Sequence, residues 1–166
     1  PRSTLFPYTT LFRSQLPITG ILRRTIFKQF CGGESIQDCE KVIRQMADFG
    51  VGTILDYSVE GEKTDAAFDA TVRETIATIQ KSAQDDGVPF SVFKVTGLAK
   101  FEVLENVSAS IRENTDLAEN DQVAFAKVRV RVHEICRTAY ENNVRILIDA
   151  EDTWIQEAID KLVKER

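Results

Sequence analysis

Three charged residues stand inside or directly after apolar runs that are typical of buried strands: Asp56, Lys94 and Asp149. Lysine is rarely buried unless it is paired. If the three strands are parallel and these side chains face one centre, Lys94 lies between two carboxylates at the carboxyl ends of the strands. A lysine in such a place can form a Schiff base with a carbonyl substrate. The plainer interpretation places Lys94 at the rim of an edge strand, with its ammonium group in water.

Two further acids follow the last of these strands. The run Arg145–Ile148 is mostly apolar and is followed by Asp149 and Glu151, after which a helical pattern starts near Trp154. Loops after the carboxyl ends of parallel strands commonly bind ligands, so these acids stand at a favourable place for chemistry. They could equally be solvated acids that open a helix, with Asp152 or Thr153 as its N-cap.

Composition excludes several classes of protein. The 166 residues are 43% hydrophobic and 28% charged, which is ordinary for one globular domain, and the net charge of −5 argues against nucleic-acid binding. No apolar run approaches the roughly 18 residues that cross a bilayer, so we expect a soluble protein. Three scattered cysteines and one histidine predict neither a disulfide framework nor a metal site.

The first 14 residues do not behave like the rest of the chain. Residues 1–14 (PRSTLFPYTTLFRS) show neither helical nor strand periodicity, and they are similar to a translated sequencing adaptor. We therefore treat residues 1–14 as a non-native segment and residues 15–166 as the domain.

Helical and strand patterns alternate along this domain. A variant capping box at Ser35 and Asp38 begins the first helix, and Gly50 stands where a left-handed residue would end it. The spacing of apolar residues predicts helices over 36–49, 68–83, 101–110, 119–141 and from 154, and strands over 52–58, 89–96 and 144–149. In the long helix over 119–141, the expected apolar stripe is Val123, Ala126, Val130, Ile135 and Cys136.

This alternation indicates an α/β fold with parallel strands and helical crossovers. It fits either a doubly wound sheet or part of an eight-fold β/α barrel, and the pattern alone does not separate these two. Two helical patterns stand between the second and third strands, so one of them is expected to be an insertion.

Four motifs in series resemble the first half of the proline dehydrogenase family. They are residues 30–35 (FCGGES), 54–60 (ILDYSVE), 93–99 (FKVTGLA) and 148–151 (IDAE), and the resemblance covers residues 21–166. It implies an incomplete β/α (TIM-type) barrel, with the first three parallel strands, their flanking helices and a helical insertion before the third strand.

The resemblance also implies a function. Proteins of this family oxidise L-proline to pyrroline-5-carboxylate with FAD and pass electrons to an acceptor such as a quinone. By motif, Lys94 would hold the proline carboxylate, Asp149 would line the site, and Asp56 would keep Lys94 charged and aimed. The backbone around Ala150 and Glu151 would approach the flavin. The full-length enzyme would be cytoplasmic in a bacterium or mitochondrial in a eukaryote, and it could associate peripherally with a membrane.

The chain departs from the family in one large respect, because the later strands, with most flavin contacts and a pair of arginines, have no counterpart in it. We therefore expect a truncated chain that is inactive by itself. Two alternatives stay open: a Schiff-base barrel aldolase that uses Lys94, and a non-catalytic interaction module. The second predicts that Asp56, Lys94 and Asp149 are dispersed and exposed.

Overall fold

The computed structural model describes residues 32–57 and 63–164. The segment 1–14 and Cys31 lie outside the described residues. The chain divides into two compact units, Pro1–Glu40 and Lys41–Arg166. Helix α4 (Ile36–Ala47) begins in the first unit, where the Ser35 hydroxyl accepts the Asp38 N–H at 3.2 Å and donates to the Asp38 carboxylate at 2.8 Å. The capping box expected from the sequence is thus confirmed.

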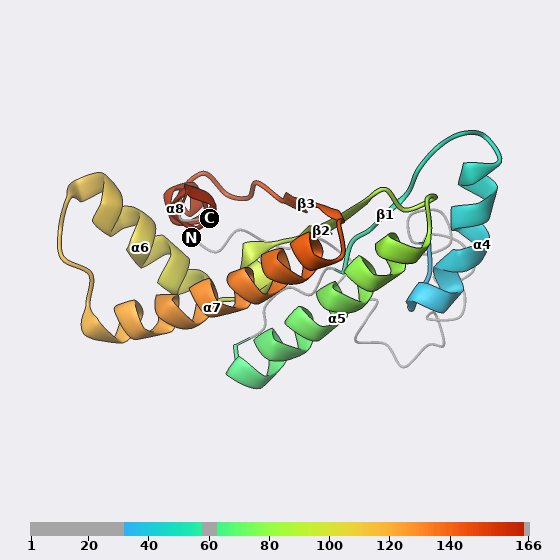
Figure 1. Cartoon of the computed structure of the whole chain (residues 1–166). Coiled ribbons are helices and arrows are strands. Elements are labelled where there is room, and N and C mark those ends of the chain that lie inside the picture. Colours follow the sequence, from blue (N-terminus) through green and yellow to red (C-terminus); the bar gives the residue numbers. More distant parts are fainter. Residues whose placement is uncertain (1–31, 58–62, 165–166) are drawn as a thin grey trace, which may run out of the picture. The chain divides into compact units, whose positions relative to one another are not determined.

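The second unit contains an open sheet of three parallel strands in the order β1-β2-β3 (Figure 1). The strands are β1 (Ile54–Leu55), β2 (Phe90–Phe93) and β3 (Arg145–Ile148). Their order and direction agree with the α/β fold expected from the sequence. Gly50, with φ +71°, has the left-handed conformation predicted for the end of α4.

Two of the strands are much shorter than predicted. The prediction of 52–58 for β1 was too long, because only Ile54 and Leu55 of this edge strand pair with β2. Ser58, the last residue of that prediction, lies outside the described residues. The prediction of 89–96 for β2 was also too long. The chain turns into a 3-10 helix, η2 (Val95–Gly97), where the Gly97 N–H donates to the Lys94 carbonyl at 3.2 Å. Lys94 is therefore the first residue after β2. Thr96 lies in the 3-10 helix, so the alternation of side chains along a strand does not continue to it.

Helix α5 (Asp65–Gln84) connects β1 to β2 and covers one face of the sheet. Thr64 caps it, because its hydroxyl oxygen accepts the Ala67 N–H at 3.2 Å. The buried face of α5 combines the apolar residues Phe68, Val72 and Ile79 with three threonines, Thr71, Thr75 and Thr78. Each threonine hydroxyl bonds a carbonyl of its own helix, and Thr78 also meets Ser91 of β2 at 2.8 Å. The hydroxyl groups of all three threonines therefore have hydrogen-bond partners within the core.

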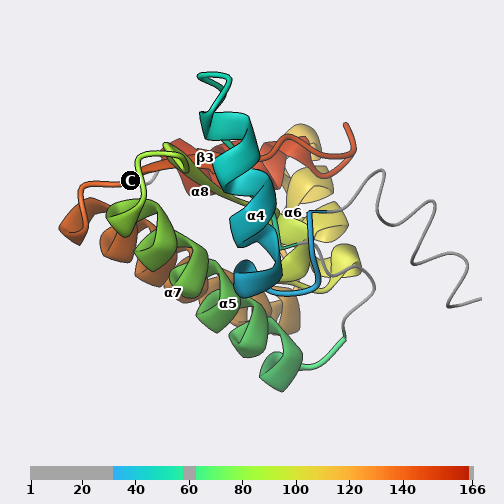
Figure 2. The ribbon, with the colours of Figure 1, turned by 90° about the vertical axis from the view of Figure 1, so that its right-hand side faces the viewer.

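Two helices connect β2 to β3, as the sequence predicts. They are α6 (Phe101–Glu113) and α7 (Glu119–Glu141). Figures 1 and 2 both show α7 beside α5, whereas α6 contacts α7 and the last helix, α8 (Gln156–Lys164). Since α7 has the position of an ordinary crossover helix, α6 is the added element.

The predicted apolar stripe of α7 was wrong in part. Val123 is 57% exposed and Val130 is 67% exposed, and Ala126 is exposed as well. The residues that are buried follow another helical spacing: Phe125, Val128, Val132, Ile135 and Ala139, with Arg131 among them. The helix has valines on two sides, and only the side that packs on α5 and α6 is covered.

Helix α8 begins later than predicted. It starts at Gln156, after a turn in which the Ile155 N–H donates to the Asp152 carbonyl at 3.0 Å. Neither Asp152 nor Thr153 therefore stands directly before the helix as an N-cap. Instead, the buried Ser108 hydroxyl of α6 accepts the Ala158 N–H at 3.0 Å. A cap from a distant helix leaves no local signal in the sequence.

Among the described residues, no helix combines the length and the apolar character that crossing a membrane requires.

Candidate functional site

The site lies at the carboxyl edge of the sheet, where each strand is followed directly by a charged residue. Asp56 follows β1, Lys94 follows β2 and Asp149 follows β3. The Asp149 N–H donates to the Phe93 carbonyl at 3.1 Å, which extends the β2-β3 pairing as far as the site. Lys94 Nζ lies 3.3 Å from Asp56 Oδ2 and 3.7 Å from Asp149 Oδ2. The convergence expected from the sequence is confirmed.

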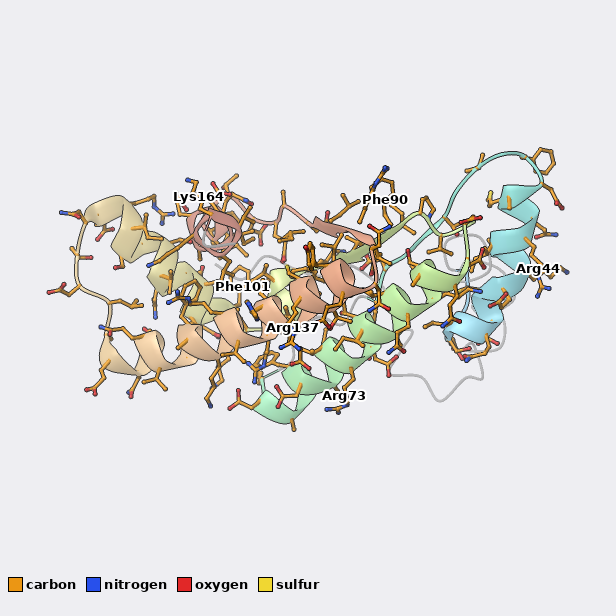
Figure 3. The ribbon with its side chains drawn as sticks, in the orientation of Figure 1. Arg44, Arg73, Phe90, Phe101, Arg137 and Lys164 are labelled. Carbon is orange, nitrogen blue, oxygen red and sulfur yellow. The ribbon has the colours of Figure 1, made fainter. Side chains whose placement is uncertain are left out.

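The face of the sheet on which these side chains stand follows from the register. Ser91 and Phe93 are fully buried on the α5 side, and Lys94 continues the extended backbone, so Val92 and Lys94 point to the opposite face. Leu147, the partner of Val92, is 41% exposed. Figure 3 shows Phe90 on the side of the sheet away from α5 and α7. The charged cluster therefore borders an apolar and partly open surface.

The environment of Lys94 keeps it protonated. Burial alone would lower the pKa of Lys94, but the hydrogen bond with Asp56 and the charges of Asp56, Asp149 and Glu151 together raise it above the ordinary value. The lysine side chain is 29% exposed, and those of Asp56 and Asp149 are 37% and 47% exposed. The three side chains of the cluster are therefore partly open to solvent.

The loop after β3 brings Glu151 to the same edge. Its carboxylate accepts the Thr96 N–H at 3.1 Å, and its own N–H donates to Gln156 Oε1 at 3.4 Å. Ala150 is exposed. The structure thus brings together all five residues singled out from the sequence, while their roles stay predictions. Sequence reasoning missed Thr96 and Gln156, because one contributes only its backbone and the other is a common helix residue.

A second polar cluster was also missed. Arg131 of α7 is buried; its Nε donates to Asp69 at 2.8 Å, its Nη2 to Asp65 at 2.7 Å and its Nη1 to the Leu98 carbonyl at 3.1 Å. Its guanidinium also lies over the Phe68 ring, 5.2 Å from the centroid. The arrangement fastens α7 to the start of α5. The partners lie more than 30 residues away in sequence, so no local sequence pattern marks this cluster.

The pKa values in this second cluster follow from the same contacts. Hydrogen bonds from Arg131 and Lys127 lower the pKa of Asp65 to about 2. Burial would lower the pKa of Arg131, but the two aspartates raise it. Each of the three guanidinium nitrogens of Arg131 donates a hydrogen bond to a protein acceptor, which favours a structural role for this arginine.

Residues 32–57 and 63–164 contain no group of three or more histidines, cysteines, aspartates and glutamates that could hold a metal ion.

Comparison with known proteins shows that the chain is similar to one protein family. The sequence profile described as proline dehydrogenase matches residues 39–165. The chain is 32% identical over 134 residues to the carbapenem antibiotics biosynthesis protein CarD of Pectobacterium carotovorum subsp. carotovorum, a match that covers 81% of the chain and 35% of that protein. It is 28% identical to the mitochondrial proline dehydrogenase 1 of Dictyostelium discoideum, over 88% of the chain and 31% of that protein.

The mitochondrial proline dehydrogenase 1 of Arabidopsis thaliana is 26% identical, over 86% of the chain and 36% of that protein. The chain thus spans about a third of the length of the curated relatives that it matches.

Proposed function

The chain belongs to the proline dehydrogenase family, and from this premise we propose that it forms the first three strands of a β/α barrel whose site oxidises L-proline to pyrroline-5-carboxylate. In this proposal the open sheet is one part of the barrel wall, and the cluster around Lys94 stands at the carboxyl-end mouth, where barrel enzymes bind substrates.

One observation carries the proposed role of Lys94: an ammonium group held between Asp56 and Asp149 at distances of 3.3 and 3.7 Å. These contacts keep the lysine charged and limit its motion, so it can bind the carboxylate of proline through a charge-assisted hydrogen bond. Asp149 lines the site beside it. Asp56 orients Lys94 from the other side.

The cluster alone has one positive charge and two negative ones. Its net charge is therefore −1, and Glu151 adds a further negative charge nearby. A substrate carboxylate needs more positive charge than this. In our proposal the remaining cations come from the later part of the barrel, where the family resemblance places a pair of arginines.

The residues after β3 fit an approach to a flavin. Ala150 is exposed and presents only a methyl group, and the Glu151 carboxylate is turned toward Thr96. The backbone between them is thus open to a planar ring. When bound, FAD would supply the hydride acceptor, while the residues of this chain bind and orient the substrate. A quinone as the final acceptor, peripheral membrane association and a bacterial cytoplasmic or eukaryotic mitochondrial location complete the proposal.

The two alternatives have less support. A Schiff-base lysine attacks as the neutral amine, and the raised pKa of Lys94 opposes that form. A non-catalytic interaction module predicts dispersed charges, whereas Asp56, Lys94 and Asp149 lie within ion-pair distance.

A chimera tests the proposed function. Residues 21–166 would replace the matching part of the Dictyostelium proline dehydrogenase, and the purified protein would be loaded with FAD. We expect L-proline to drive reduction of a dye by this chimera. The unmodified Dictyostelium enzyme provides the positive control. A folded, flavin-loaded chimera that leaves the dye oxidised in the presence of proline would contradict the proposal.

A further inference from the structure

We propose that Glu151 is a positioning residue, whose carboxylate ties the loop after β3 to the loop after β2 and so holds Lys94 beside Asp149. The consequence for substrate binding rests on the proposed function. The mechanical coupling itself does not depend on proline or flavin.

Two hydrogen bonds join the loop after β2 to the loop after β3, one on each side of Lys94. On one side, the Asp149 N–H donates to the Phe93 carbonyl at 3.1 Å. On the other side, the Thr96 N–H donates to the Glu151 carboxylate at 3.1 Å. Lys94 follows Phe93 and precedes Thr96, and Asp149 precedes Glu151 by two residues. Lys94 therefore lies between the two hydrogen bonds and Asp149 makes one of them, so the two loops are joined on both sides of Lys94.

Backbone pairing between β2 and β3 cannot supply the second of these hydrogen bonds. β2 ends at Phe93, and the 3-10 turn of η2 takes the Thr96 N–H out of line with β3. A backbone donor left in this half-buried place would need a partner. The Glu151 side chain reaches across from the neighbouring loop and provides it.

The loop after β3 is itself held by other contacts. Gln156 at the start of α8 accepts the Glu151 N–H at 3.4 Å. Arg112 of α6 donates to the Trp154 carbonyl at 3.3 Å and to Glu157 at 2.8 Å. The added helix α6 thus holds the end of this loop, and Glu151 transmits that fixed position to the residues around Lys94.

Glu151 could instead act on Lys94 only through its charge, and two substitutions separate these possibilities. Glu151→Gln removes the charge but keeps an oxygen that can accept the Thr96 N–H. Glu151→Ala removes both. If position matters, the coupling between Lys94 and Asp149 survives the first change and is lost with the second.

The test uses the complete 166-residue chain and nuclear magnetic resonance. The pKa of Lys94 is measured from its side-chain signals, with and without Asp149→Asn, in the parent, Glu151→Gln and Glu151→Ala proteins. We expect Asp149→Asn to lower the pKa of Lys94 by similar amounts in the parent and Glu151→Gln proteins, and by much less in Glu151→Ala. An equal decrease in all three proteins would overturn the proposal.

A second measurement covers the case in which Glu151→Ala does not fold. In the parent chain, the Thr96 amide proton should shift as the Glu151 carboxyl group titrates, and this shift should be absent from Glu151→Gln. A Thr96 amide that does not respond in the folded parent would overturn the proposal. Neither measurement involves turnover, so a chimera inactive toward proline would contradict the proposed function and leave this inference standing.

Discussion

Lys94 does not depend equally on its two carboxylates. Asp56 accepts a hydrogen bond from the ammonium group at 3.3 Å, whereas Asp149 lies at 3.7 Å and acts through its charge. We therefore predict that Asp56→Asn lowers the pKa of Lys94 more than Asp149→Asn does. Titration of the Lys94 side-chain signals in both variants measures this, and a larger decrease in Asp149→Asn would show that the order is reversed.

Asp65 gives the fold a defined dependence on pH. Its pKa is about 2 in the folded chain, because Arg131 and Lys127 donate hydrogen bonds to it, and a free aspartate has a pKa of about 3.9. A lowered pKa stabilises the fold above the unfolded value, and this stabilisation is lost as the pH falls through the folded value.

We therefore predict that Asp65→Asn is less stable than the parent at pH 7, and that the difference shrinks as the pH falls from about 4 to about 2. Urea denaturation of both proteins across this range measures it. A difference that stays constant down to pH 2 would mean that the charge of Asp65 contributes nothing.

Arg131 fastens helix α7 to helix α5. Its side chain is 8% exposed, and it bonds two aspartates and the Leu98 carbonyl. We predict that Arg131→Met lowers the free energy of unfolding by about 2 kcal/mol, since charged hydrogen bonds are lost while the half-exposed aspartates regain water. Arg73→Met is the matched control, because Arg73 is exposed on α5 (Figure 3). Equal stability losses in the two variants would rule out the proposed anchor.

How far the sequence predicts these elements depends on what each one contacts. The order and type of the described helices and strands follow from periodicity, because one face of each meets the core. The apolar stripe of α7 could not be read in the same way. Its exposed valines, Val123 and Val130, look the same in sequence as the buried Val128 and Val132. Only the position of α5 and α6 decides which side is covered.

The candidate site was likewise predictable only in part. The meeting of Asp56, Lys94 and Asp149 follows from parallel strands whose carboxyl ends share an edge, so it was predictable. The bond between Thr96 and Glu151 was not, because it depends on where β2 ends and η2 begins. Nor was the Arg131 cluster, whose partners come from another helix.

Because its sheet is open, we expect the 166-residue chain to bind L-proline poorly. The open three-stranded sheet leaves its carboxyl edge accessible to water, and the site has a net charge of −1 from one lysine and two aspartates. We predict that the 166-residue chain, mixed with FAD, does not oxidise L-proline. Proline-dependent reduction of a dye measures this, and turnover above a control without protein would show that these three strands suffice.

The role of Lys94 in holding a substrate carboxylate is the central claim, and the Michaelis constant for L-proline tests it most directly. In the active chimera, Lys94→Ala removes a charge-assisted contact worth about 1.5 to 3 kcal/mol, which corresponds to an increase of roughly ten- to hundredfold. Lys100→Ala, at an exposed lysine before α6, is the control and should leave the constant unchanged. A Michaelis constant that is the same in Lys94→Ala as in the parent chimera would contradict the account.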